Sequence, residues 1–259
     1  MKAKSYAKVN IFLKITGIKE YNNTLYHTLN SRFMLVKSLY DIIEFVPQPC
    51  DTFTIEGVNI DTKDNIIYKA YRALNQYTGD LDILNFFYNH KVVVKKNIPF
   101  SAGLGGGSSN AATFINMVNE VCNLNRTKDE LAKIGATVGA DVPFFIYGYD
   151  SANVSGIGDI IEPFDEEVQN LDIFTPPEEC NTALVYKKFD ECCLSDINPH
   201  NGASLMLNRS IDILNSIKDA KKLNDLYKAA LMVCPKLKEY QKKEYYLSGS
   251  GSSFFKVKE

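Results

Sequence analysis

Apolar and polar positions alternate at the start of the chain. Residues 7–15, AKVNIFLKI, therefore predict a strand with two distinct faces. One face carries Val9, Ile11, Leu13 and Ile15. The other carries Lys8, Asn10, Phe12 and Lys14. Three further extended segments follow after short polar breaks, at residues 27–36, 39–46 and 51–57.

Helical spacing appears next. Residues 65–77 place their apolar positions on one stripe, made of Ile66, Ile67, Ala70, Tyr71 and Leu74. Residues 85–98, NFFYNHKVVVKKNI, predict a strand that ends at Pro99, and a helix is expected from about Ser108 to Cys122. Residues 127–139 predict another helix, with Thr127 and Glu130 in capping-box spacing and Gly139 at its end.

The second half of the chain has a different pattern. Residues 151–164 and 170–177 predict short strands, and residues 181–191 predict a helix. Residues 210–244 are mostly helical in pattern, and residues 245–259 predict a strand, a glycine-serine turn and a second strand. We interpret the change of composition near residues 150–170 as the border between two lobes of an α+β protein, at 1–150 and 151–259.

Composition excludes several classes of protein. The 259 residues carry a formal net charge of -2, which argues against a nucleic-acid partner. No apolar run reaches membrane-spanning length, and Lys8 and Lys14 interrupt the apolar N-terminus, which argues against a signal peptide. The six cysteines form no C-x-x-C pair, so we expect reduced, mostly structural thiols in a cytoplasmic protein.

The stretch NIPFSAGLGGGSSNAATFINMVNEV, residues 97–121, places five glycines just before a predicted helix. Backbone N–H groups at a helix N-terminus attract anions. Glycines allow the backbone to adopt a positive φ and allow a phosphate to approach it closely. A tight turn without a ligand is the alternative. A Walker loop is disfavoured because no lysine follows the glycines, and a dinucleotide fingerprint is disfavoured because Ser108 replaces its third glycine.

The segment PFSAGLGGGSSNAA resembles the second motif of the GHMP small-molecule kinases. AKVNIFLKITG, YHTL, GADVPFF and LSGSGSSFF accompany it in the order typical of one branch of that family. The resemblance implies a ribosomal-protein-S5-domain-2-like N-terminal lobe and a ferredoxin-like C-terminal lobe. It also implies transfer of a phosphoryl group from ATP, with Mg2+, to the 2-hydroxyl of cytidine-diphospho-methylerythritol, in the non-mevalonate route to isoprenoid precursors.

The resemblance also implies site residues. The ATP phosphates would lie against Pro99, Phe100, Ser101, Ala102, Gly103, Leu104, Gly105, Gly106, Gly107, Ser108 and Ser109. Ser108 or Ser109 would stand near the metal. Asp141 would be the catalytic base, made more basic by its apolar neighbours, and Lys8 would orient it. From residue type alone, Asp141 could instead be a cap or turn residue after Gly139, and Lys8 a solvated lysine on an exposed face.

The acceptor would be bound by Asn10, by Tyr26 and His27 of the YH element, and by Tyr186 on the other face of the cytosine. Ordinary half-buried tyrosines are the alternative for Tyr26 and Tyr186. His90 and His200 are expected to be structural. The chain departs from the family at Thr24-Leu25, where Asp-Gly is usual.

Two rival hypotheses stay open. One is another GHMP kinase, for homoserine or mevalonate, although the YH element and Tyr186 favour a cytidine-bearing acceptor. The other is a binding or regulatory protein of this fold without catalysis, against which Lys8 and Asp141 argue.

In the family, the turn at residues 248–253 closes the site from the second lobe. We expect small-molecule partners only, no membrane contact, and a monomer or weak dimer.

Overall fold

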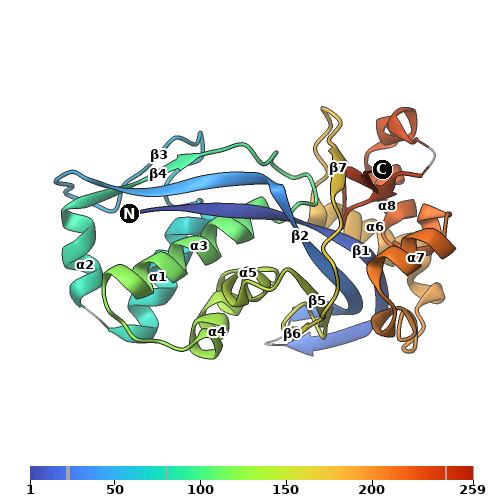
Figure 1. Cartoon of the computed structure of the whole chain (residues 1–259), viewed down its shortest axis with the longest axis horizontal. Helices are drawn as coiled ribbons and strands as arrows, with labels where there is room; N and C mark the ends of the chain where they lie inside the picture. The colour runs from blue at the N-terminus through green and yellow to red at the C-terminus, as the bar shows by residue number, and fades with distance from the viewer. Residues whose placement is uncertain (22–23, 80, 243, 259) are drawn as a thin grey trace. The chain divides into compact units, whose positions relative to one another are not determined.

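The structure, a computed structural model, describes residues 1–21, 24–79, 81–242 and 244–258. The chain divides into two compact units, each assembled from separate segments (Figure 1). Unit 1 contains Met1–Ala7, Lys37–Ile98 and Gly105–Tyr149. Unit 2 contains Lys8–Val36, Pro99–Leu104 and Asp150–Glu259. The division into lobes at 1–150 and 151–259 stays a prediction.

Helices and strands are mixed in both units, which confirms the predicted α+β class. Two long strands pass through both units, β1 (Lys2–Tyr21) and β2 (Thr24–Pro47). Unit 1 adds β3 (Ile55–Glu56), α1 (Ile66–Thr78), α2 (Leu81–Tyr88), β4 (His90–Lys95), α3 (Gly106–Val121), α4 (Lys128–Val138) and α5 (Val142–Tyr147).

Unit 2 adds a smaller sheet and shorter helices. Its remaining strands are β5 (Ser151–Ser155), β6 (Ile160–Pro163), β7 (Leu171–Phe174), β8 (Tyr246–Leu247) and β9 (Phe254–Val257). Its α-helices are α6 (Thr182–Cys193), α7 (Ser210–Ser216) and α8 (Tyr227–Val233). Its 3-10 turns are η1 (Leu194–Asp196), η2 (Leu205–Leu207), η3 (Ala220–Lys222) and η4 (Pro235–Tyr240). Pro235 therefore opens the last helical segment, as predicted.

In unit 1, β2 pairs antiparallel with β4 from Ile42 to Pro47, and β3 pairs parallel with β4. The helices pack on one face of these strands (Figure 1). The core between them is rich in aromatic rings, with Phe45 contacting Phe114 edge to face at 5.7 Å between ring centroids. This packing buries the inner side of α3, whose N-terminus follows the glycine turn.

Side-chain caps begin two helices of unit 1, and the ends predicted for the helix at residues 127–139 are confirmed. Asn65 caps α1 by accepting a hydrogen bond from the backbone N–H of Ile67, at 2.9 Å. Thr127 and Glu130 form the complete capping box at the start of α4, which ends at Gly139. These caps satisfy backbone groups that the helices themselves leave without partners.

The predicted strand at residues 85–98 is wrong in its first part. Residues up to Tyr88 belong to α2, and β4 begins only at His90. The reason is the spacing of Ile83 and Phe87, which are four residues apart and both buried, so a helix turns them toward the same core. Phe87 stacks against Phe114 there, with 5.5 Å between ring centroids.

Two further strand boundaries differ from the predictions. The segments 27–36 and 39–46 are parts of one strand, β2, because Lys37 and Ser38 continue the extended backbone between them. In the segment 51–57, only Ile55 and Glu56 pair with a neighbouring strand. At Lys37 and Ser38 polar residues interrupted the apolar pattern, but strand pairing depends on the backbone rather than on side-chain polarity.

In unit 2, Ser31–Met34 of β2 pairs antiparallel with β5, and β6 extends this sheet. A second sheet has the order β7-β9-β8. The predicted strands at residues 151–164 and 170–177, the helix at residues 181–191 and the C-terminal strand-turn-strand are all confirmed.

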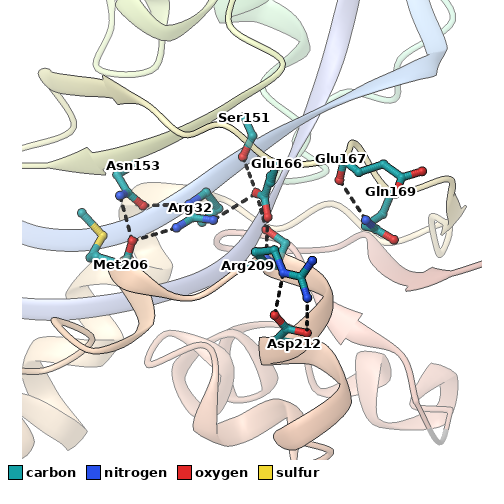
Figure 2. A network of polar contacts seen from close by, with 10 residues as sticks. Arg32, Ser151, Asn153, Glu166, Glu167, Gln169, Met206, Arg209 and Asp212 are labelled. Carbon is teal, nitrogen blue, oxygen red and sulfur yellow. Dashed lines mark hydrogen bonds and ion pairs between the residues drawn. The ribbon is translucent and has the colours of Figure 1, made fainter.

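A buried arginine fixes β2 within unit 2 (Figure 2). The Arg32 guanidinium donates to Asn153 Oδ1 at 2.7 Å, to Glu166 Oε1 at 3.0 Å and to the carbonyl oxygen of Met206 at 3.0 Å. Burial lowers the pKa of Arg32, and the Glu166 carboxylate opposes that decrease. Arg32 thereby connects β2 to the chain around residues 166 and 206.

Candidate active site

Lys8 and Asn10 lie on the same face of β1, as alternation predicted. The Lys8 ammonium donates to Asn10 Oδ1 at 2.6 Å and to the carbonyl oxygen of Gly103 at 3.3 Å. Asn10 donates in turn to Ser31 Oγ at 3.0 Å. The ammonium also lies 4.6 Å from the centre of the Phe33 ring.

Lys8 is only 4% exposed, so the alternative of a solvated lysine is wrong. Burying an ammonium group costs free energy unless oxygen atoms or a ring face compensate its charge. Here Asn10, Gly103 and Phe33 supply that compensation. A charge held in this way keeps a fixed position, which suits electrostatic stabilisation of a reacting group.

The first half of the glycine turn, Pro99–Leu104, belongs to unit 2. Gly103 has a φ of 72°, and an added Cβ would lie 2.1 Å from the carbonyl oxygen of Ser248. Both its backbone conformation and this close approach therefore require glycine. The side chain of Phe100 is exposed.

The second glycine-serine turn, Ser248–Ser253, packs against this first half. Ser248 Oγ donates to the carbonyl oxygen of Gly103 at 2.9 Å, and the backbone N–H of Ser253 donates to Ala102 at 3.0 Å. Ser252 Oγ is buried without a hydrogen-bond partner among the described residues. The turn is therefore part of the candidate site rather than an ordinary hairpin connection.

The second half of the glycine turn, Gly105–Ser109, belongs to unit 1 and starts α3. Gly105 is the N-cap residue, with a φ of 67° and no side chain to cap the helix. The first backbone N–H groups of α3 thus have no acceptor within the helix. Ser109 is buried and accepts a hydrogen bond from Ser5 Oγ at 2.7 Å, whereas Ser108 is half-buried.

Gly106 and Gly107 have different surroundings. Gly106 has no positive φ, so its need for glycine comes from close contact alone: an added Cβ would lie 2.8 Å from Ile98 Cγ2 and 3.0 Å from Lys96 Nζ. At exposed Gly107, an added Cβ would meet only Ile66 Cγ2, in ordinary contact at 3.7 Å. Protein packing therefore does not require glycine at position 107.

Sequence reasoning missed Asp41, which holds the chain before the glycine turn. Its fully buried carboxylate accepts from Lys96 Nζ at 2.6 Å and from the backbone N–H groups of Asn97 and Ile98 at 2.7 and 2.8 Å. Burial lowers the pKa of Lys96, and Asp41 opposes the decrease. Asp41 lies 55 positions before Lys96 in the chain, so no local motif indicates this contact.

Asp141 stands at the N-cap position of α5, but its side chain makes no capping hydrogen bond. A side-chain cap is therefore wrong, but Asp141 does lie in the turn after Gly139, as the other part of that alternative predicted. Its carboxylate is half-buried, and the following Val142, Pro143 and Phe144 are buried. Asp141 belongs to unit 1 and Lys8 to unit 2, so their pairing stays a prediction.

His27 and Tyr186 come together in unit 2. Their ring centroids are 5.0 Å apart and the rings are tilted by 38°. His27 Nε2 also forms a hydrogen bond with Asp190 Oδ1 at 2.6 Å, and Phe189 contacts the imidazole edge to face. Tyr26 is 41% exposed. Residues 22–23, just before the departure at Thr24-Leu25, lie outside the described residues.

Asp190 and Phe189 were not predicted to contact His27. They follow Tyr186 in α6 at spacings of four and three residues, so a helix places all three on neighbouring positions of one face. The helical pattern of residues 181–191 could have indicated this face, but not that His27 lies against it.

Other kinds of site find no support. Within residues 1–21, 24–79, 81–242 and 244–258, no group of three or more His, Cys, Asp or Glu side chains could hold a metal ion. None of the six cysteines forms a disulfide in the part of the chain that the structure describes. None of the helices in the described part of the chain has the length and apolarity that a membrane crossing requires.

Comparison with known proteins agrees with the resemblance. Residues 65–149 match the family described as GHMP kinases N terminal domain. The 4-diphosphocytidyl-2-C-methyl-D-erythritol kinase of Sulfurovum sp. (strain NBC37-1) is 48% identical over 98% of this chain and 98% of its own length. The enzyme of the same name from Campylobacter jejuni (strain 81116 / NCTC 11828) is 41% identical over 98% of this chain and 99% of its own length.

Solved structures confirm the two-lobed fold. A crystal structure of 4-(cytidine 5'-diphospho)-2C-methyl-D-erythritol kinase has a TM-score of 0.74 and 26% identity, covering 100% of this chain and 90% of its own. The mevalonate kinase of Methanococcus jannaschii has a TM-score of 0.60 and 16% identity, covering 100% of this chain and 90% of its own. The second likeness concerns the fold alone.

Proposed function

Since the chain belongs to the GHMP kinases, within the family of 4-diphosphocytidyl-2-C-methyl-D-erythritol kinases, we propose that residues 99–109 hold ATP while Lys8 and Asp141 act on the acceptor hydroxyl. The reaction is ATP-dependent phosphorylation of 4-diphosphocytidyl-2-C-methyl-D-erythritol on its 2-hydroxyl, giving the 2-phosphate and ADP. It is a step of the non-mevalonate route to isoprenoid precursors.

The start of α3 is the observation that carries the ATP assignment. Its first N–H groups have no acceptor within the helix, Gly105 provides no side-chain cap, and Gly107 is exposed with no packing reason to be glycine. Backbone N–H groups in this arrangement bind phosphate oxygens, and the helix dipole favours their negative charge. A ligand-free turn would not explain glycine at position 107.

Asp141 is the proposed general base. Its carboxylate would accept the proton of the 2-hydroxyl as the hydroxyl oxygen forms a bond to the γ-phosphorus of ATP. The bond from that phosphorus to the oxygen bridging to the β-phosphate breaks at the same time, and ADP leaves with the electron pair. Support comes from its position, since the half-buried carboxylate stands at the start of α5 beside the buried Val142, Pro143 and Phe144.

Lys8 is the proposed electrostatic partner of this step. Its ammonium is held by Asn10 and Gly103, and it would stabilise negative charge that develops between the hydroxyl and the γ-phosphate. A lysine fixed in advance costs little reorganisation when the charge develops.

Magnesium bound with ATP would neutralise charge on the phosphates. The Ser108 hydroxyl fits a place beside it better than that of Ser109, since Ser109 is buried and accepts a hydrogen bond from Ser5. Hydroxyl and phosphate oxygens are ligands that Mg2+ prefers, and few protein ligands are needed when phosphates supply the rest.

The cytosine of the acceptor is assigned to Tyr26, His27 and Tyr186, with Asn10 closer to the reacting end. The tilted contact between His27 and Tyr186 supports this, because an imidazole and a phenol ring at 5.0 Å can form one wall for a flat base. We place the reaction in the cytoplasm, with small-molecule partners, no nucleic acid, and a monomeric or weakly dimeric enzyme.

ADP release tests the proposal. The purified protein is incubated with ATP, Mg2+ and one acceptor at a time: the cytidine-diphospho-methylerythritol, homoserine or mevalonate. Release above background is expected only with the first acceptor. Equal release with homoserine or mevalonate would favour the rival kinases, and no release with any acceptor would favour a binding protein without catalysis.

A further inference from the structure

A cavity of about 450 Å3 in unit 2 contains none of the predicted site residues. It lies between α6, α8, η3 and η4, and we call it the lysine cavity because Lys221, Lys228 and Lys238 all line it. Each lysine comes from a different element, η3, α8 and η4 respectively. The protein as a whole has a net charge of -2, so this concentration of lysines does not follow from a basic chain.

The charges in the lysine cavity are predominantly positive. None of the three ammonium groups has a carboxylate partner among the residues for which contacts are described. Two carboxylates line the same cavity, but that of Asp225 already pairs with Lys14 of β1. Asp196 alone is left to oppose three lysines, so the cavity favours an anion.

Apolar side chains complete the wall. Phe189 and Tyr227 contribute rings, and Leu231 and Met232 contribute aliphatic groups. Burial raises the pKa of the nearby Cys193 thiol to about 11, a rise that the adjacent Cys192 thiol adds to and Lys228 opposes. The thiol therefore stays neutral near pH 7 and does not offset the lysine charges.

Asn224 and Asp225 line the lysine cavity and also contact two parts of the candidate active site, β1 and the glycine-serine turn at residues 248–253. The buried Asn224 amide donates to the carbonyl oxygens of Leu247 and Gly249, at 3.0 and 2.8 Å, and so holds the C-terminal glycine-serine turn. Asp225 accepts from the backbone N–H of Ile15 at 2.9 Å and donates its own backbone N–H to Leu13 at 2.9 Å. These contacts hold β1 a few residues beyond Lys8 and Asn10.

We propose that the lysine cavity binds a small organic diphosphate with a short apolar chain, and that the bound ligand changes catalysis through Asn224 and Asp225. The lysines would bind the diphosphate and the rings and aliphatic groups would cover the chain. A ligand against Asn224 and Asp225 shifts the same residues that position β1 and the glycine-serine turn. This regulatory site goes beyond the proposed function.

Isothermal titration calorimetry tests the binding with isopentyl diphosphate, inorganic pyrophosphate and isopentanol as probes. Isopentyl diphosphate is expected to bind at least about tenfold more tightly than pyrophosphate, because burying several methylene groups adds affinity, and isopentanol is expected not to bind. Equal affinity for pyrophosphate would overturn the assigned ligand class. No binding of isopentyl diphosphate at millimolar concentration would overturn the site.

Lys228→Gln and Lys222→Gln are the matched variants. Lys222 is an exposed lysine of η3 that does not line the cavity. Lys228→Gln is expected to weaken binding of isopentyl diphosphate at least about fivefold, while Lys222→Gln leaves it unchanged. Equal weakening in both variants would show a diffuse charge effect and contradict the proposal.

Two controls separate this site from the substrate sites. Binding is repeated with saturating ADP and then with saturating acceptor, and the affinity is expected to stay within twofold in each case. Loss of binding would place the diphosphate in a substrate site and overturn the proposal. Finally, saturating isopentyl diphosphate is expected to change kcat at least threefold in the wild type but not in Lys228→Gln, because a change in kcat does not require the two ligands to alter each other's affinity. An unchanged kcat in the wild type would refute the coupling.

Discussion

The hydroxyl of Ser248 donates a hydrogen bond to the carbonyl oxygen of Gly103 across 145 positions of sequence. The same two residues are in close backbone contact, since a Cβ on Gly103 would lie 2.1 Å from the carbonyl oxygen of Ser248. The backbone N–H of Asn10 also donates to Ser248 Oγ, at 3.3 Å. One serine therefore fixes the first half of the glycine turn to β1.

Asp141→Asn is expected to lower kcat about 100- to 10,000-fold while the Kd for ATP changes less than twofold. The amide keeps the size of the side chain but cannot accept the proton of the hydroxyl. Steady-state kinetics and calorimetry with ATP measure the two effects. Asp165→Asn, at an exposed carboxylate, is the matched control and should retain wild-type kcat. If the Asp141 variant kept more than a tenth of kcat, the base would lie elsewhere.

Gly107→Ala separates ATP binding from stability. The added methyl group meets no close protein atom, so the free energy of unfolding should stay equal or rise by up to about 1 kcal/mol. The methyl group would, however, stand where a phosphate approaches the backbone, so the Kd for ATP should rise about tenfold or more. Thermal unfolding and calorimetry give both values.

Gly148→Ala provides the comparison for that experiment. Gly148 ends α5 with a φ of 74° and has open space around it. Alanine there should lower stability by about 1 kcal/mol through backbone strain and leave the Kd for ATP unchanged. Unchanged ATP affinity in a folded Gly107→Ala protein would mean that the turn does not cradle phosphate.

Tyr186→Ala should raise the acceptor KM about five- to 100-fold, since loss of one stacking face costs about 1–3 kcal/mol. The KM for ATP and kcat should change little if stacking is equal in ground and transition states. Tyr186→Phe retains the ring and should behave like the wild type. A raised ATP KM with normal acceptor KM would instead assign Tyr186 to the core or the nucleotide site.

Arg32→Met should destabilise the protein by about 3–5 kcal/mol, because it leaves the Glu166 carboxylate buried without its cation. Urea unfolding measures this change. The double variant Arg32→Met/Glu166→Gln removes the buried charge as well and should be more stable than Arg32→Met alone. A double variant that is no more stable than the single one would show that Arg32 acts through packing, for example against Phe164, whose ring centre lies 3.4 Å from the guanidinium carbon.

Local pattern predicted most of the fold, because it reports burial within one element. Alternation placed Lys8 and Asn10 on one face of β1, and capping-box spacing placed the start of α4 at Thr127. It failed for α2, where the aromatic run of Phe86, Phe87 and Tyr88 favours a strand by propensity but packs as a helix. Tertiary contacts with α3 decided between the two.

Residues of the candidate site could be predicted only where they belong to a recognisable sequence motif. The glycine turn and Asp141 have local signatures, and His27 and Tyr186 came from the family resemblance. Asp41, Asp190 and Asn224 have none, because each acts on a partner far away in sequence, such as Asn224 on Gly249. Such contacts follow from the folded topology, which the pattern of a single sequence does not reveal.

The division of the chain between units sets an order for folding during synthesis. All segments of unit 1 have emerged from the ribosome once Tyr149 is free, whereas residues 8–36 must wait for β5 and for the final glycine-serine turn. At about 5–20 residues per second, the wait from Val36 to the C-terminal strand lasts roughly ten to forty seconds. Until β5 emerges, Ser31–Met34 of β2 lacks the strand with which it pairs, so the apolar segment around Phe33 stays exposed on the nascent chain for the first part of that wait.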